Sequence, residues 1–120
     1  MSEFEGSNFN NIIRKIIKKS LFTERQIEII LNQRDLLRTR FPITRGAYYR
    51  QVGQSREKLV SFFYTMAVLR GLDILLPEDV DVIMELAAKV DVINRGDVPP
   101  GSVNEMIDVI ETYVRQACSV

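Results

Sequence analysis

Apolar residues recur at helical spacing along most of the chain. Between Asn8 and Lys19, isoleucine and phenylalanine fall three, four, seven and eight residues apart, and basic residues fill the opposite side. Similar stripes occupy four further stretches, 24–38, 44–70, 77–93 and 103–114. No stretch alternates for long with the period of two that marks a strand. The pattern predicts an all-α fold, a compact helical domain of about five helices.

Capping residues and prolines set the boundaries of these helices. Thr23–Gln26 is a capping box that begins the second helix, and Pro42 stops it before Phe41 because a proline disfavours helical geometry in the preceding residue. Thr44 caps the third helix, and Pro77 fits the first turn of the fourth. Ser102–Glu105 is a second capping box, which begins the last helix.

Two points of the secondary structure stay open at this stage. Gly46 and Gly53 each cost a helix on the order of 1 kcal/mol, so 44–70 is either one long helix or two joined at Gly53. A short strand pair at 72–75 and 91–93 is the alternative to helix there.

The charge is balanced overall but unevenly distributed. Residues 11–58 hold twelve basic and four acidic residues, a net +8, whereas residues 71–120 hold three basic and ten acidic residues, a net −7. The basic stretch can release counterions from the phosphates of a nucleic acid, whereas the acidic stretch is repelled by those phosphates. We therefore expect a basic, DNA-binding half at 1–70, and an acidic half at 71–120 that completes the core and dimerises.

The residue inventory excludes several classes of function. With no histidine and one cysteine, Cys118, the chain lacks the usual zinc ligands and histidine-dependent catalytic groups, and no phosphate-binding glycine motif occurs. We expect no enzyme activity, cofactor, metal site or small-molecule substrate. Cys118 is either a buried or fraying thiol or an interchain disulfide near a two-fold axis. With no membrane-spanning run and no signal peptide, we expect a cytoplasmic protein without a membrane association.

The third predicted helix divides into two faces. Tyr48 and Val52 are four residues apart and, with Ile43, are expected to pack on the second helix. The opposite face then displays guanidinium groups, a phenol and positions without a side chain: Arg45, Gly46, Tyr49, Arg50 and Gly53. Arginine can grip phosphate or donate two hydrogen bonds to guanine, and glycine allows close approach of a backbone. This face is the candidate DNA contact.

A family resemblance supports this interpretation. The run from Thr44 to Val52 resembles the recognition helix of helix-turn-helix proteins, and 22–31 and 54–59 are similar to the flanking runs of sigma factor region 4. Small archaeal DNA-binding proteins with such a unit are the group it resembles. The resemblance implies a short extra helix within 32–40, which leaves 41–43 for the turn.

The resulting hypothesis is a transcriptional regulator that binds double-stranded DNA by insertion of a helix in the major groove. Its predicted DNA-binding residues are Arg45, Gly46, Tyr49, Arg50, Gln54, Arg56, Lys18, Lys19, Arg38 and Arg40. A homodimer through the C-terminal helices would present two such surfaces.

Three alternatives to this DNA-binding hypothesis stay open. The chain can be a helical protein–protein adaptor without DNA binding. The first helix can be an interfacial membrane anchor, although it is short and core packing of its isoleucines is the favoured explanation. Arg45, Tyr49 and Arg50 can be an ordinary exposed face paired with Glu57 or Asp35.

Overall fold

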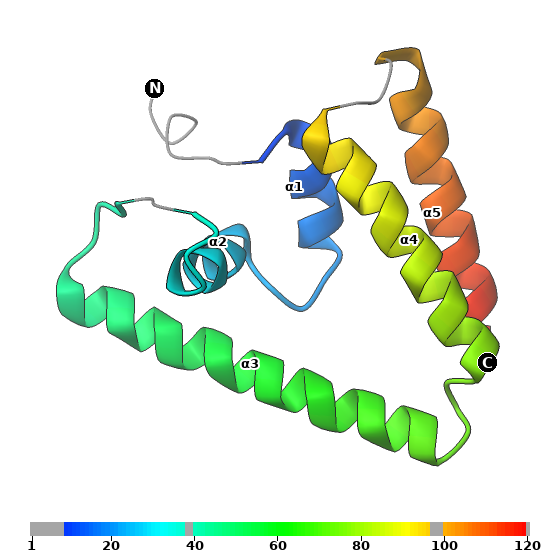
Figure 1. Ribbon diagram of the computed structural model, residues 1–120, viewed down its shortest axis with the longest axis horizontal. Helices are drawn as coiled ribbons and strands as arrows, with labels where there is room; N and C mark the ends of the chain where they lie inside the picture. Colours follow the sequence, from blue (N-terminus) through cyan, green and yellow to red (C-terminus); the bar gives the residue numbers. More distant parts are fainter. Residues whose placement is uncertain (1–8, 38–39, 97–99, 120) are drawn as a thin grey trace. The chain divides into compact units, whose positions relative to one another are not determined.

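A computed structural model describes residues 9–37, 40–96 and 100–119, and within these ranges the chain is helical without strands. Figure 1 shows the order of the elements. The five α-helices are α1 (Asn11–Lys18), α2 (Glu24–Gln33), α3 (Arg45–Gly71), α4 (Pro77–Arg95) and α5 (Val103–Ala117), with a short 3-10 turn, η2 (Pro100–Ser102), before the last. The all-α prediction is confirmed, and the strand pair at 72–75 and 91–93 is wrong because 91–93 belongs to α4.

The contacts divide the chain into two units, Met1–Thr65 and Met66–Val120. In the first unit, α1 packs against α2. The Asn10 side chain caps α1 and accepts hydrogen bonds from the amides of Ile12 and Ile13. Ile13 is buried on the inner face of this helix, and the predicted amphipathic helix is confirmed.

The capping box at Thr23 forms as predicted. The Thr23 hydroxyl accepts from the Gln26 amide at 3.1 Å, and the Gln26 side chain accepts from the Thr23 amide at 2.9 Å. The other end of α2 differs from the prediction, because the helix stops at Gln33 instead of continuing towards 38. Asp35 adopts a left-handed conformation there, with φ 57°, and the Leu36 amide donates back to the Leu31 carbonyl at 2.9 Å.

One continuous helix occupies 45–71, which answers the question raised by Gly53. The side of α3 that faces α2 carries Val52 and Ser55, both buried, and Leu59 continues this side one turn further on. The Ser55 hydroxyl donates to the Gln51 carbonyl at 2.8 Å, so this small polar residue is satisfied within its own helix. α2 therefore supports the first half of α3.

The second unit contains α4 and α5, which contact each other. Pro77 takes the first position of α4, and the Asp79 carboxylate accepts from the Leu76 amide at 2.8 Å. The helix ends before Gly96, whose φ of 75° is a conformation that favours glycine. The predicted capping box at Ser102 is wrong, because Ser102 has helical backbone angles and its side chain makes no capping hydrogen bond.

Few large apolar side chains are buried. In the described ranges only Ile13, Ile29, Val52 and Ile93 fall in the buried class, although hydrophobic residues make up 46% of the sequence. Many of the others, from Val60 onwards in particular, stay exposed. No helix in those ranges combines the length and apolar character required to cross a membrane.

Candidate nucleic-acid interface

The first turn of α3 is built as the sequence predicts. The Thr44 hydroxyl accepts from the Ala47 amide at 3.1 Å, and the Thr44 carbonyl accepts from the Tyr48 amide at 2.9 Å. The cap leaves other first-turn amides directed out of the helix end, where the helix dipole favours an anion.

Tyr48 fixes the start of α3 against the end of α2. Its hydroxyl accepts from the Asn32 side chain at 2.9 Å and donates to the Gln33 side chain at 2.9 Å. Its ring stacks on Phe41 with centroids 5.7 Å apart, and the Arg25 guanidinium lies 5.0 Å from the centre of the Phe41 ring. The predicted inward orientation of Tyr48 is therefore confirmed, although the ring is half-buried.

Lys58 forms a second attachment between α3 and the start of α2. Its ammonium donates to the Leu21 carbonyl at 2.7 Å and to the Gln26 side chain at 2.8 Å, and it lies 5.8 Å from the centre of the Phe22 ring. Gln26 is the same residue that completes the capping box of α2. Tyr48 and Lys58 thus hold the helix at two places ten residues apart, which fixes the rotation of the side chains between them.

Most of the predicted contact residues lie on the exposed side of this fixed segment. Tyr49 is 55% exposed. Five others are also exposed: Arg45, Gly46, Arg50, Gln54 and Arg56. Gly53 is half-buried, and a Cβ built on it or on Gly46 would meet no atom within 4 Å. The predicted division of this helix into an inner and an outer side is confirmed.

The guanidinium groups on the outer side have no ion-pair partner among the residues that the structure describes. Ion pairs within the described ranges involve arginines elsewhere, such as Arg14 with Glu24 at 2.9 Å and Arg70 with Asp73 at 3.6 Å. Over the same ranges, Arg45, Arg50 and Arg56 form none. The alternative in which this face pairs with Glu57 or Asp35 is therefore not what the structure contains.

An open pocket lies beside the N-terminal end of α3. Two cationic and four apolar or aromatic side chains line it: Arg40, Arg45, Phe41, Ile43, Tyr48 and Tyr49. Tyr49 meets Tyr48 edge to face, with centroids 5.2 Å apart. Guanidinium groups next to exposed aromatic edges suit a phosphate with its attached sugar or base.

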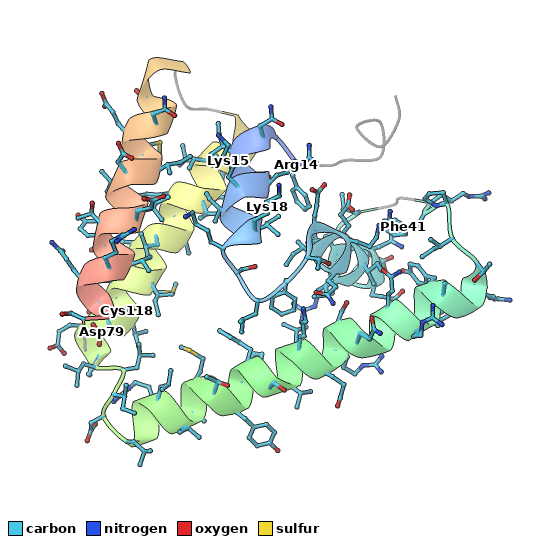
Figure 2. The ribbon with its side chains drawn as sticks, turned by 180° about the vertical axis from the view of Figure 1, so that it is seen from behind. Arg14, Lys15, Lys18, Phe41, Asp79 and Cys118 are labelled. Atoms are coloured by element: carbon cyan, nitrogen blue, oxygen red, sulfur yellow. The ribbon has the colours of Figure 1, made fainter. Side chains whose placement is uncertain are left out.

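The other predicted residues lie elsewhere. Lys18 and Lys19 are exposed at the end of α1, and Figure 2 shows Lys15 and Lys18 well apart from Phe41, which belongs to the connection before α3. Arg38 lies outside the described residues. Arg56 borders a groove between α2 and α3, where it is joined by Arg34.

Two members of this surface were not predicted. Arg34, the residue directly after α2, lines the groove, and the Phe41 ring contacts both the Arg25 guanidinium and the Tyr48 ring. The signal for Phe41 was its position before Pro42, which keeps it extended at a helix start. The extra short helix implied by the sigma factor resemblance is absent from the described part of 34–43.

The described residues contain no cluster of three or more acidic or cysteine side chains that could hold a metal ion. Cys118 is exposed directly after α5, with a free thiol. Comparison of the chain with known protein families, curated proteins and solved structures finds no match.

Proposed function

We propose that this chain is a double-stranded DNA-binding protein, a transcriptional regulator that inserts the first half of α3 in the major groove. The observation that carries the proposal is a set of three exposed arginines that form no ion pair with any described residue, on a helix whose opposite side is fixed to α2. Arginines on a fixed helix suit the recognition of phosphate and guanine, because they have no ion pair with a described residue to break before they bind.

Charge and shape give independent support. The surrounding sequence, 11–58, carries a net +8, which favours association with a polyanion at low salt. Gly46 and Gly53 are seven residues apart, so they fall two turns apart on the same outer side. They leave space at which a phosphate backbone can approach the helix closely. The connection 34–44 is longer than the turn of three or four residues in helix-turn-helix proteins, so the proposal concerns α3 and leaves the family's docking angle aside.

The test is a fluorescence anisotropy titration of random-sequence duplex DNA at low and high salt. We expect binding at low salt that weakens steeply as salt is raised. Arg45→Ala and Arg50→Ala should each weaken binding by about 5- to 100-fold, with the helical circular dichroism unchanged, since neither side chain forms an ion pair with a described residue. Arg115→Ala is the matched control, because Arg115 is an exposed arginine on the acidic α5.

Three results would contradict the proposal in different ways. Absence of binding at low salt would remove DNA as the partner. Unchanged affinity in both α3 variants would move the contact to the exposed lysines of α1, such as Lys15 and Lys18. An equal loss in Arg115→Ala would indicate a general charge effect without a defined surface.

A further inference from the structure

The open pocket beside the N-terminal end of α3 combines cations with aromatic rings. It is lined by two arginines, three aromatic residues and one isoleucine, and no acidic side chain of the described ranges lines it. All six residues belong to the first of the two units. Its volume of about 640 Å³ falls within the roughly 300–1,000 Å³ of sites that take small organic groups. The pocket supplies positive charge and ring faces, so its ligand has to supply the negative charge.

The two arginines of this pocket are available to an anion. Arg40 and Arg45 are both exposed, and neither forms an ion pair with a described residue. Arg40 lies in the connection before α3 and Arg45 begins α3, so the two cations come from different elements. A pair of guanidinium groups suits a phosphate, because its oxygens accept several charge-assisted hydrogen bonds.

The aromatic residues divide into a fixed wall and an open ring. The Tyr48 hydroxyl is hydrogen-bonded to Asn32 and Gln33, and the Tyr48 ring stacks on Phe41. Tyr49 stands perpendicular to Tyr48, at an interplanar angle of 89°, and is 55% exposed. Because a perpendicular neighbour covers at most one face of a ring, Tyr48 leaves a face of Tyr49 uncovered. A further planar group can therefore stack on Tyr49.

This combination of a phosphate site and a stacking ring selects an unpaired nucleotide. Inside a duplex the faces of each base are covered by its neighbours, so a duplex offers only phosphates, sugars and base edges. A nucleotide in a single strand offers a phosphate and a free base face together. Sites for free small molecules bury most of the ligand, whereas this pocket is open, so it suits a nucleotide whose strand is held by other contacts as well.

We propose that this pocket binds one unpaired nucleotide of a DNA strand, with its phosphate held by Arg40 and Arg45 and its base stacked on Tyr49. The inference rests on the proposed binding of DNA by α3 and adds a preference for DNA that carries a single-stranded overhang. Arg50 and Arg56, exposed further along α3, remain for the duplex beside the overhang. A stacking ring accepts every base, so the preference is independent of the overhang sequence.

The first test compares three DNA molecules that share one duplex. One is blunt, one has a single-stranded overhang of about three nucleotides, and one has an abasic overhang with the same number of phosphates. Anisotropy titrations at low salt should show that the overhang DNA binds at least about 5-fold more tightly than the blunt duplex. The abasic overhang adds charge without bases, and should bind less than about 2-fold more tightly than the blunt duplex.

Two variants assign this gain to the pocket. Tyr49→Ala should lower the ratio of overhang to blunt affinity to less than about 2-fold, because the stacking ring is lost. Tyr64→Ala is the matched control, an exposed tyrosine of α3 outside the pocket, and should leave that ratio unchanged. Arg40→Gln should reduce the slope of log affinity against log salt by about 0.7 for the overhang DNA, since one phosphate contact to a single strand is lost.

Photo-cross-linking locates the base without a disruptive variant. Iodouracil in the overhang should cross-link to Tyr49 on irradiation, and mass spectrometry of the digested complex identifies the residue. Cross-links shared equally between Tyr49 and Tyr64 would overturn the proposal, because both tyrosines are exposed on the same helix.

The DNA series separates failure of this inference from failure of DNA binding itself. Blunt duplex that binds as tightly as overhang DNA would overturn the nucleotide pocket and leave the proposed function intact. Absence of binding to all three DNA molecules at low salt would overturn both. A full gain from the abasic overhang, or a free deoxynucleotide that binds as tightly as the overhang DNA, would overturn the assignment to an unpaired nucleotide of a strand.

Discussion

Basic residues in the N-terminal half have different tasks, although the sequence makes them look alike. The Lys58 ammonium has a carbonyl and an amide oxygen as acceptors, whereas Arg45 and Arg50 have no ion-pair partner in the described ranges. A cation with protein acceptors stabilises the fold, and a cation without them is available to an external anion. Net charge therefore overstates the number of groups that can neutralise phosphate.

This difference predicts the behaviour of Lys58→Met. The substitution removes two charge-assisted hydrogen bonds that join α3 to the start of α2, and its partial exposure to water limits the cost. We expect a decrease of about 1–2 kcal/mol in the free energy of unfolding, measured by urea denaturation. Lys15→Met is the control, since Lys15 is exposed on α1, and should change stability by less than about 0.5 kcal/mol. An equal decrease in the free energy of unfolding of both variants would mean that the Lys58 hydrogen bonds do not stabilise the fold.

At the level of the helix, Gly53 stands out as a glycine that the fold does not require. Its backbone is helical, and a Cβ there would meet nothing within 4 Å. Gly53→Ala should raise the free energy of unfolding by about 0.5–1 kcal/mol, because alanine loses less conformational entropy in a helix. Gly96→Ala, at φ 75°, should lower it in the same urea experiment. A loss of stability at position 53 would show that the described space is filled in solution.

Helix starts were predictable where a single side chain determines them. Thr23, Thr44 and Pro77 act locally, so their sequence signals sufficed. The end of α2 was missed because Asp35 takes a left-handed position that sequence rules assign to glycine or asparagine. Ser102 carries the capping pattern but has helical backbone angles, which prevents the cap.

The two sides of α3 at the candidate interface were also predictable, but the hydrogen bonds of its cations were not. The helical period separated Tyr48 and Val52 from Arg45, Tyr49 and Arg50 without knowledge of the partner helix. The period does not reveal which cations are already hydrogen-bonded, since the acceptors of Lys58 come from residues 32 and 37 positions away in the sequence. Long-range contacts of this kind need the fold.

On the scale of the molecule, the uneven charge predicts how the affinity for DNA depends on salt. The stretch 11–58 carries a net +8, and binding that releases counterions from phosphates weakens as the salt concentration is raised.

The unbroken course of α3 from Arg45 to Gly71 has one more consequence. No break in the helix separates the arginines of its first turns from its C-terminal half, so the angle between any two of its side chains depends only on the number of residues between them. One inserted residue would rotate the arginines about 100° away from their present direction, whereas seven would restore that direction to within about 20°. An insertion of seven residues, about two turns, would therefore preserve the relative directions of the side chains on the two halves of α3, whereas a single inserted residue would not.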